Sequence, residues 1–224
     1  HGHVRRVDND GIIRNIAGAA FQWDKGDGGP AISANLSYPV SVAHDIQDNI
    51  YIGDAIGRIR RVDAQTGIIE TVAGKGLDGY SGDHGLATQA YIGNPQGMYL
   101  DDVGALYFAD STHHVIRKID TLGVITTVAG IGQEGFSPDG TIASEAKISR
   151  PQSVIVVSNR IVYFTDTGNR KVRRIANDGS LETVAGSDTP GDFGDGGVAT
   201  AAGLNEPHGI AMYGEHILLI SDYH

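Results

Sequence analysis

Residues 95–130 read PQGMYLDDVGALYFADSTHHVIRKIDTLGVITTVAG, and this stretch decides the fold. It contains four short runs rich in apolar and β-branched residues, at 95–100, 105–109, 114–119 and 124–129. Turn-forming Asp, Gly, Ser and Thr residues separate the runs, and no segment of the chain shows a helical period over ten or more residues. This pattern predicts four β-strands joined by tight turns.

The second run, ALYFA at 105–109, shows no alternation of apolar and polar residues. Similar runs occur at 50–52, 162–164 and 217–220. A strand with one face in water alternates, whereas a strand covered on both faces does not. We therefore expect each second strand to lie between two neighbouring sheets.

The stretch is one of four copies, because several anchor residues recur every 56 positions and four times 56 is the full length of 224. The anchors are Gly18, Gly74, Gly130 and Gly186; Pro39, Pro95, Pro151 and Pro207; Asp54, Asp110, Asp166 and Asp222; and the loop residues Asp27, Asp83, Asp139 and Asp195. Four strands per repeat predict an all-β fold, a β-propeller of four-stranded antiparallel blades, in a single domain over residues 1–224.

The boundaries of the repeats do not coincide with the two ends of the sequence. It starts inside a third strand (3–7) and stops just after a second strand (217–220), so the order is half a blade, three blades and half a blade. If the ends meet, residues 1–18 complete the last blade, which gives a closed four-blade ring without open edges. The alternative is a segment of a six-bladed propeller. The missing initiator Met and signal peptide favour a processed or excerpted chain.

Composition narrows the function classes. Lys and Arg number 17 against 27 Asp and Glu, so the net charge of −10 argues against nucleic-acid binding. There is no Cys, which excludes disulfides and thiolate metal sites. Apolar runs reach only five residues, so no transmembrane segment is expected. The 32 Gly residues indicate many tight turns.

The segments Gly26-Asp-Gly-Gly-Pro-Ala31, Arg58-Ile-Arg-Arg-Val-Asp63 and Thr71-Val-Ala-Gly74 resemble the NHL repeat in its long, glycine-rich form. Later copies match in part, as in Gly82-Asp-His-Gly85 and Gly194-Asp-Gly-Gly197, and the resemblance covers essentially the whole chain. It implies a propeller, six-bladed as a rule, that serves mostly as an extracellular or cell-surface binding platform. A minority of such proteins are lyases or lactonase-like enzymes with a channel metal, and some bind RNA.

The loops that lead from one repeat to the next are long and acidic, and we expect them to share one face of the propeller. Their carboxylates predict a surface for a protein or glycan partner, comprising Asp24, Asp27, Asp78, Asp83, Asp139, Asp192 and Asp195. The alternative interpretation is that Asp and Gly serve only as turn formers.

A cation site is a further hypothesis. Asp24-x-x-Asp27 and Asp192-x-x-Asp195 could supply oxygen ligands for Ca²⁺ or another divalent cation. His208 begins an inner strand and could face a channel metal, but the equivalent positions are Val40, Gln96 and Gln152. A channel metal needs ligands from several blades, so no cofactor is expected.

Eleven of the 17 basic residues lie in the third strands. Solvated outer strands are the favoured interpretation, with a nucleic-acid belt as the alternative. Arg61, Arg117 and Arg173 follow the recurrent aspartates by seven positions and could pair with them. The aspartates themselves are expected to cap the following turns rather than to form a ring of ligands.

No Gly-x-Ser-x-Gly elbow or catalytic triad stands out. One glycosylation sequon is present, Asn35-Leu-Ser37. We therefore predict a non-enzymatic binding or structural assembly module outside the cytoplasm, with self-association in a larger assembly as one form of partnership. The alternatives are a propeller lyase or hydrolase with a channel metal, and an RNA-binding NHL domain.

Overall fold

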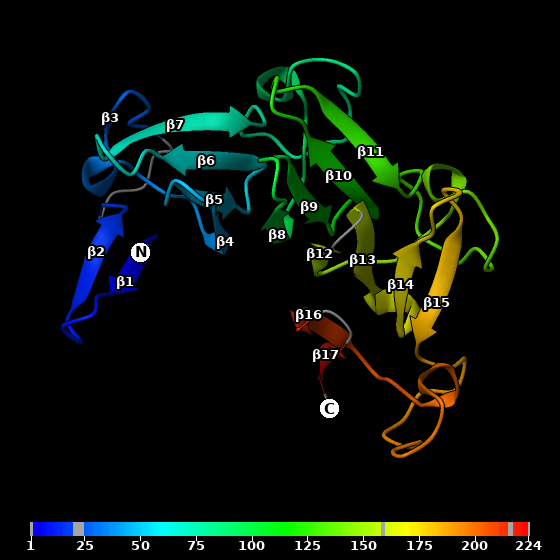
Figure 1. The fold of residues 1–224 in the computed structure, drawn as a ribbon. Coiled ribbons are helices and arrows are strands. Elements are labelled where there is room, and N and C mark those ends of the chain that lie inside the picture. The colour runs from blue at the N-terminus through cyan, green and yellow to red at the C-terminus, as the bar shows by residue number, and fades with distance from the viewer. Residues whose placement is uncertain (1, 20–24, 158–159, 215–216, 224) are drawn as a thin grey trace.

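The computed structural model describes residues 2–19, 25–157, 160–214 and 217–223, and its strands form five antiparallel sheets (Figure 1). Three of the sheets are complete blades. The first blade along the chain holds β4 (Pro39–His44), β5 (Ile50–Asp54), β6 (Arg58–Val62) and β7 (Ile68–Ala73), and the short β3 (Gly29–Pro30) adds to its outer edge. The second holds β8 (Pro95–Leu100), β9 (Leu106–Asp110), β10 (Val115–Ile119) and β11 (Ile125–Ala129). The third holds β12 (Val154–Val157), β13 (Ile161–Asp166), β14 (Lys171–Ile175) and β15 (Leu181–Ala185).

Two hairpins flank the complete blades. The N-terminal half-blade pairs β1 (Val4–Val7) with β2 (Ile13–Ala17), and the C-terminal half-blade pairs β16 (Pro207–Tyr213) with β17 (Ile217–Asp222). The predicted order of half a blade, three blades and half a blade is therefore confirmed. The inner strands β4, β8, β12 and β16 pack in succession along the inside of an arc, and β7, β11 and β15 lie on its outside (Figure 1).

The core lies between blades rather than within a single sheet. Strand β9 is buried along its whole length. Phe108 packs in a cluster with Ile59 of the first blade, whereas Tyr107 packs in a cluster with Val154 of the third. Successive side chains of a strand point to opposite faces, so neighbouring blades cover both faces of β9. This explains why the second strand lacks polar alternation.

The recurrent glycines mark a close approach of two backbone segments. Gly130, after β11, has a φ of +92°, and a Cβ there would lie 2.3 Å from the carbonyl oxygen of His114. Gly74 and Gly186 have the same conformation and the same kind of contact. Only glycine combines this backbone conformation with the missing Cβ.

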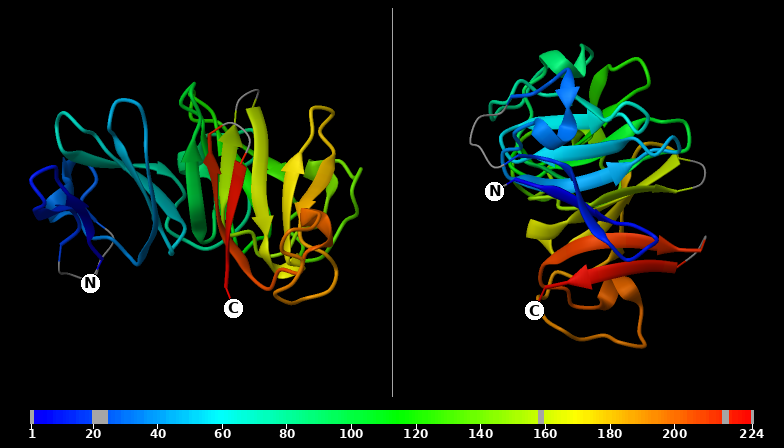
Figure 2. Two further views of the ribbon diagram at one scale, coloured as in Figure 1. Left: turned by 60° about the horizontal axis from the view of Figure 1, so that its bottom comes forward. Right: turned by 90° about the vertical axis from the view of Figure 1, so that its left-hand side faces the viewer.

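The predicted closure into a four-blade ring is not formed. The two half-blades are separate two-stranded sheets, and β1 does not pair with β17. The blades form an open arc with the half-blades at its ends (Figures 1 and 2). A repeat spacing fixes the number of strands, but the angle between blades depends on the side chains packed between them.

Five single-turn 3-10 helices occur in the described residues, where no helix was expected. Four recur every 56 positions, namely η1 (Ala31–Ser33), η2 (Ala87–Gln89), η3 (Ala143–Glu145) and η6 (Ala199–Ala201), and η5 (Thr167–Asn169) lies between β13 and β14. Three residues are too few to show a helical period. None of the helices in the described residues is long and apolar enough to cross a membrane.

Candidate functional site: the junction loops

The loops between an outer strand and the next inner strand, which we term the junction loops, comprise residues 25–38, 74–94, 130–153 and 186–206. Each bridges two blades at the outer rim. In the second loop the Ala87 carbonyl accepts a hydrogen bond from the Gly74 N–H beyond β7, and the Ala87 N–H donates to the Gly123 carbonyl before β11. The loops thus lie along the rim of the arc rather than on one face of a disc, as Figure 1 shows for the helices η1 to η3.

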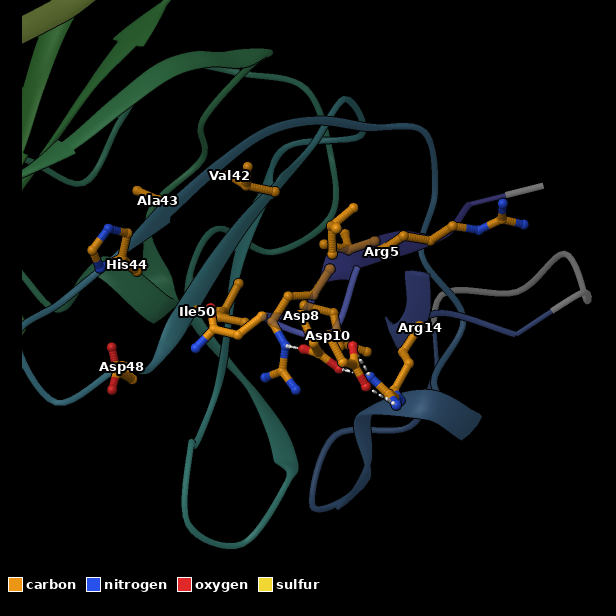
Figure 3. Close-up of a pocket in the computed structure, with 14 residues that line it drawn as sticks. Arg5, Asp8, Asp10, Arg14, Val42, Ala43, His44, Asp48 and Ile50 are labelled. Carbon is orange, nitrogen blue, oxygen red and sulfur yellow. Dashed lines mark hydrogen bonds and ion pairs between the residues drawn. The ribbon is translucent and has the colours of Figure 1, made fainter. Parts of the chain in front are cut away.

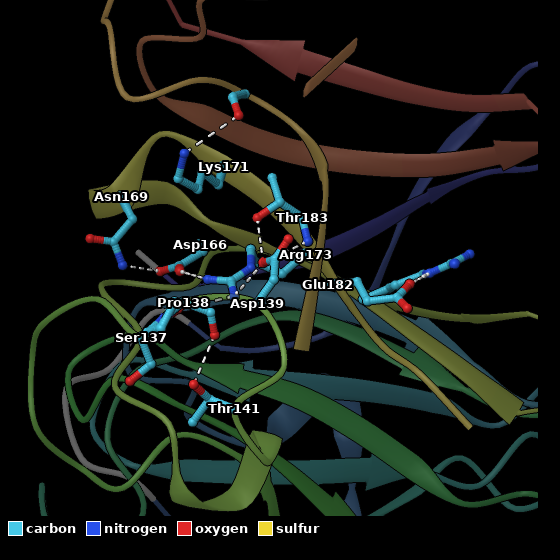
Figure 4. Close-up of polar contacts among 12 residues, drawn as sticks. Ser137, Pro138, Asp139, Thr141, Asp166, Asn169, Lys171, Arg173, Glu182 and Thr183 are labelled. Carbon is cyan, nitrogen blue, oxygen red and sulfur yellow. Dashed lines mark hydrogen bonds and ion pairs between the residues drawn. The ribbon is translucent and has the colours of Figure 1, made fainter. Parts of the chain in front are cut away.

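In each complete blade, a buried arginine on the third strand holds a junction loop in place. Asp83 accepts a hydrogen bond from Arg117 Nη2 at 2.5 Å. Asp139 accepts one from Arg173 Nη2 at 3.1 Å, which Figure 4 shows. In the first blade Asp27 accepts bonds from Nε and Nη2 of Arg60. All three arginines are fully buried. Charge-assisted bonds of this kind are among the stronger polar contacts in proteins.

The same aspartates also bind the outer strand. Asp83 accepts the Thr127 N–H at 3.1 Å, and Asp139 accepts the Thr183 N–H at 3.0 Å. Desolvation opposes ionisation of Asp27, but bonds from Thr71 and Arg60 outweigh it and lower the pKa of this carboxyl. The first three junction loops are therefore each joined to two strands of the blade that follows. We term this unit, comprising an aspartate, a buried arginine and a threonine N–H, the clamp.

Aromatic rings cover two of the clamps. The Arg117 guanidinium lies 5.1 Å from the ring centroid of Tyr80, and that of Arg173 lies 5.4 Å from the ring of Phe136. Such cation–π contacts shield the arginine and add to the attraction. The Tyr80 hydroxyl also shares a hydrogen bond with Thr127 Oγ1 at 3.0 Å, so the ring is fixed in place.

The recurrent aspartates at the ends of the second strands secure the other end of each loop. Asp110 accepts the Gly93 N–H at 2.8 Å, Asp166 accepts the Ser149 N–H at 2.6 Å, and Asp222 accepts the Asn205 N–H. Burial raises the pKa of Asp166 to about 6, although bonds from Asn169, Ser149 and Arg173 oppose the rise. Arg173 contacts Asp166 at 3.5 Å, as predicted from their spacing of seven.

His113 joins this network at the turn between β9 and β10. Its Nδ1 lies 3.1 Å from Oδ1 of the buried Asp110, and its Nε2 lies 3.8 Å from Asp78 in the junction loop. The ring stacks on Tyr80. The hydrogen bond with Asp110 raises the pKa of His113, and desolvation only partly offsets this.

The structure separates the residues predicted to bind a partner or cation. Asp27, Asp83 and Asp139 serve in clamps, and the ring of His208 lies near Tyr223 on the C-terminal half-blade. Asp192 and Asp195 are exposed in the fourth loop, and Asn35 is half-buried with its carbonyl bound to Arg60. Asp24 lies outside the described residues. Among the described residues, no three His, Cys, Asp or Glu side chains come together as metal ligands would.

The interpretation of the third strands as solvated outer strands is wrong for the three complete blades. There β6, β10 and β14 each lie between the second and the outer strand, whereas the arginines of β1 in the N-terminal half-blade are exposed. The arginines at the clamp positions of the complete blades are buried, and in the first blade the paired residue is Arg60 rather than Arg61. Only three residues separate β5 from β6, against four between β9 and β10. The predicted spacing of seven residues after Asp54 therefore points to Arg61, one position beyond the arginine that is paired.

A hollow of about 830 Å³ lies between the N-terminal half-blade and the first blade (Figure 3). Its apolar wall includes Ile16, Val42 and Ile50. Asp8 and Asp10 at its edge bind Arg14, and bonds from arginine side chains lower the pKa of both carboxyls. The residues that line it include no Ser, Thr, Cys or Tyr that could act as a nucleophile.

Sequence reasoning missed the apolar character of the rim. Large apolar side chains are exposed in every junction loop, namely Ile32, Tyr38, Leu77, Tyr80, Leu86, Phe136, Ile142, Phe193 and Val198. Three of them, Leu86, Ile142 and Val198, recur every 56 positions. This recurrence in the sequence could have revealed the apolar rim. An apolar residue that returns at the same position of each glycine-rich loop has the same structural place in every repeat and is not a random surface residue.

Known proteins resemble this chain over the junction loops and blades described above. One protein-family description, Teneurin NHL domain, matches residues 75–137, which cover the second junction loop and the second blade. NHL repeat-containing protein 2 of Gallus gallus is 40% identical over 73 residues, 32% of this chain and 10% of that protein. Residues 75–137 thus match an NHL domain. The repeat type predicted from the glycine-rich motifs is therefore confirmed.

Longer alignments connect the NHL repeats to larger proteins. Teneurin-4 of Homo sapiens is 27% identical over 96% of this chain and 9% of its own length. Protein SUPPRESSOR OF QUENCHING 1, chloroplastic, of Arabidopsis thaliana is 28% identical over 74% of this chain and 16% of its own length. The chain thus spans a small fraction of the curated relatives it matches.

Solved structures share the arrangement of the blades. A streptogramin B lyase structure aligns over 98% of this chain and 55% of its own, with a TM-score of 0.58 and 19% identity. A putative gluconolactonase aligns over 98% of this chain and 64% of its own, with a TM-score of 0.58 and 11% identity. At these identities the likeness is one of fold.

Proposed function

We propose that this chain is a non-enzymatic binding module that acts outside the cytoplasm and presents its outer rim to a protein partner. One observation carries the proposal. The junction loops are held by buried arginines, yet the same loops leave large apolar side chains in solvent.

Rigid loops with exposed apolar groups suit protein recognition. A loop that is already ordered loses little conformational entropy on binding. Exposed Leu86 and Ile142 supply apolar area, and Phe136 supplies an aromatic anchor. The acidic Asp78, Asp188 and Asp192 lie in these loops, so a partner with a basic rim around an apolar centre fits best.

The enzyme and RNA alternatives receive less support. The lyase and gluconolactonase structures share the fold, but a shared fold does not transfer activity. Of the predicted ligands in the described residues, Asp27 already binds Arg60, and His208 lies on a different element. RNA binding would need a concentrated basic surface, whereas the net charge is −10 and three arginines of the third strands, Arg60, Arg117 and Arg173, are buried.

A binding screen with two matched variants tests the proposal. The rim variant carries Leu86→Ser and Ile142→Ser, and the control carries Ile46→Ser and Val103→Ser on turns between first and second strands, where both residues are exposed. Immobilised protein is presented with a panel of purified ectodomains and a glycan array. We expect saturable binding of an ectodomain to wild type and control, and a loss of about tenfold or more in the rim variant.

Two outcomes would count against the proposal. Equal binding by the rim variant and the control would place the partner site elsewhere. Turnover of a substrate that depends on an added divalent metal, and that falls on His208→Ala, would favour the enzyme alternative.

The location outside the cytoplasm has its own test. Asn35 belongs to a sequon and is half-buried. Expression through a eukaryotic secretory pathway should add one glycan to wild type and none to Asn35→Gln, seen as a mass difference. Secreted protein without any glycan would leave Asn35 as a structural residue.

A further inference from the structure

One histidine, His113, connects the turn between β9 and β10 to the second junction loop. Its Nδ1 lies 3.1 Å from Oδ1 of the buried Asp110, and its Nε2 lies 3.8 Å from Oδ1 of Asp78 in the loop. The histidine side chain is 20% exposed, whereas that of Asp78 is 65% exposed. The ring therefore joins a carboxylate fixed inside the blade to a carboxylate of the loop that lies mostly in solvent.

The third blade has an equivalent bridge that cannot titrate near neutral pH. Asn169 follows His113 by 56 positions. Its Nδ2 donates to Oδ1 of the buried Asp166 at 2.9 Å and to the carbonyl oxygen of Gly135, in the third junction loop, at 2.8 Å. An amide group keeps both N–H donors at any pH near neutral. The two loops are thus held at the same place, one by an amide and the other by an imidazole.

The bonds that His113 can donate depend on its charge. An imidazolium has two N–H donors, one for Asp110 and one directed at Asp78, whereas a neutral imidazole has only one. The Asp110 carboxylate, at the shorter distance, retains that proton on Nδ1, so Nε2 then presents a lone pair to Asp78. Loss of the proton therefore removes the attraction to the loop and leaves the bond to the blade.

The groups around the ring set the pH at which this change occurs. Among the described residues, the titratable and charged groups that act on it are Asp110 at the end of β9, Asp78 and Tyr80 of the loop, Arg117 of β10 and the adjoining His114. The hydrogen bond with Asp110 raises the pKa of His113 most and the charge of Asp78 adds to the rise, while desolvation and Arg117 oppose it. Burial lowers the pKa of His114, so that ring is neutral where His113 titrates. The charge of His113 is therefore lost at a pH above about 6.5.

We propose that His113 is a pH-dependent latch for residues 77–79 of the second junction loop, holding them against the β9–β10 turn when it is charged and releasing them when it is neutral. The release is local, because the clamp formed by Asp83 and Arg117 still holds the rest of the loop. The released segment carries the exposed side chain of Leu77.

The latch regulates how the rim is presented, and to that extent the inference rests on the proposed function. A segment that is held in one position loses less conformational entropy when a partner binds to it. A partner that contacts Leu77 should therefore bind more tightly at lower pH. The latch itself is a property of the loop, so it can be tested without a partner.

A spin label on the loop tests the latch. The chain has no Cys, so Leu77→Cys carries a single nitroxide in the second loop, and Gln133→Cys, 56 positions later, carries one at the equivalent place of the third loop. Both positions are exposed. Electron paramagnetic resonance measures the mobility of each label from about pH 5.5 to about pH 8.5. Leu77→Cys is then combined with His113→Asn, which copies the bridge of the third blade, and separately with Asp78→Asn.

We expect the mobile fraction of the label at position 77 to rise by about threefold as the pH increases, because the ion pair that is lost is partly exposed and therefore weak. The label at position 133 should not respond, since an amide holds that loop. His113→Asn should remove the response at position 77, and Asp78→Asn should leave that label mobile at every pH.

Three results would overturn the inference: a label at position 77 that does not respond to pH, an equal response at position 133, or a response at position 77 that persists in His113→Asn. Circular dichroism checks that each variant is folded, and if His113→Asn is not, the result with Asp78→Asn decides, because it changes only an exposed side chain. None of these measurements involves a partner, so failure of the latch is distinguishable from failure of the rim function.

Discussion

Asp83 and Arg117 are 34 positions apart in the sequence, and a 2.5 Å hydrogen bond joins Oδ1 of the aspartate to Nη2 of the arginine. The arginine also donates to the carbonyls of Ser81 and Tyr91, which lie in the same junction loop. One buried side chain on β10 therefore organises a loop that contains no regular strand. The pairs Asp27–Arg60 and Asp139–Arg173 repeat this relationship.

The clamp position in the first blade can be tested with adjacent arginines. Arg60→Lys should lower the free energy of unfolding by about 2 kcal/mol, because a lysine cannot reproduce three directed bonds in a buried site. Arg61→Lys should change it by less than about 0.5 kcal/mol, since Arg61 lies partly in solvent. Urea unfolding of both variants checks this. A larger effect at Arg61 would contradict the assignment of the clamp.

The recurrent glycine after each outer strand gives a second test. Gly130→Ala should cost about 3 kcal/mol or more, because its φ is positive and the new Cβ would overlap the His114 carbonyl oxygen. Gly123→Ala has a similar φ of +78° but no atom within 4 Å, so it should cost about 1 kcal/mol. Thermal unfolding compares the two. Equal losses would show that close approach of the backbone is unimportant.

Burial between blades can be tested at Phe108. Phe108→Ala should cost about 3–5 kcal/mol, because the ring fills a cluster formed by two blades. Leu122→Ala, at an exposed turn, should cost less than about 0.5 kcal/mol. Denaturant unfolding followed by fluorescence measures both. A small loss at Phe108 would mean that the second strand is not enclosed.

His113 should make stability depend on pH. Its raised pKa means that the folded chain binds the proton more strongly than the unfolded chain. This contribution is fully present below the unfolded pKa of about 6.5 and is lost as the pH rises through the folded pKa. The melting temperature of wild type should therefore fall from about pH 5.5 to about pH 8 by more than that of His113→Gln. Equal slopes for wild type and His113→Gln would contradict this assignment.

Much of the fold follows from the sequence because strands alternate and repeats align. The strand order and the enclosed second strand were both predicted from runs such as residues 105–109. The open arc was not predicted, because the angle between neighbouring blades depends on how residues such as Phe108 and Tyr107 pack.

The candidate site was predicted less well. Asp27, Asp83 and Asp139 were correctly picked out as a repeated set, but their arginine partners lie 33 or 34 positions away. The constant repeat length of 56 residues also concealed that the paired arginine of the first blade is Arg60 and not Arg61. The first blade has a shorter turn before β6, and one extra residue in the following turn restores the 56-residue repeat.

The central claim is that the loop aspartate and the buried arginine act as a coupled pair, and a double-mutant cycle on Asp83 and Arg117 tests it most directly. The free energies of unfolding are measured for wild type, Asp83→Ala, Arg117→Met and the double variant. We expect a coupling energy of about 2 kcal/mol, with the double variant losing clearly less stability than the two single losses added together. Losses that add within about 0.5 kcal/mol would contradict the account.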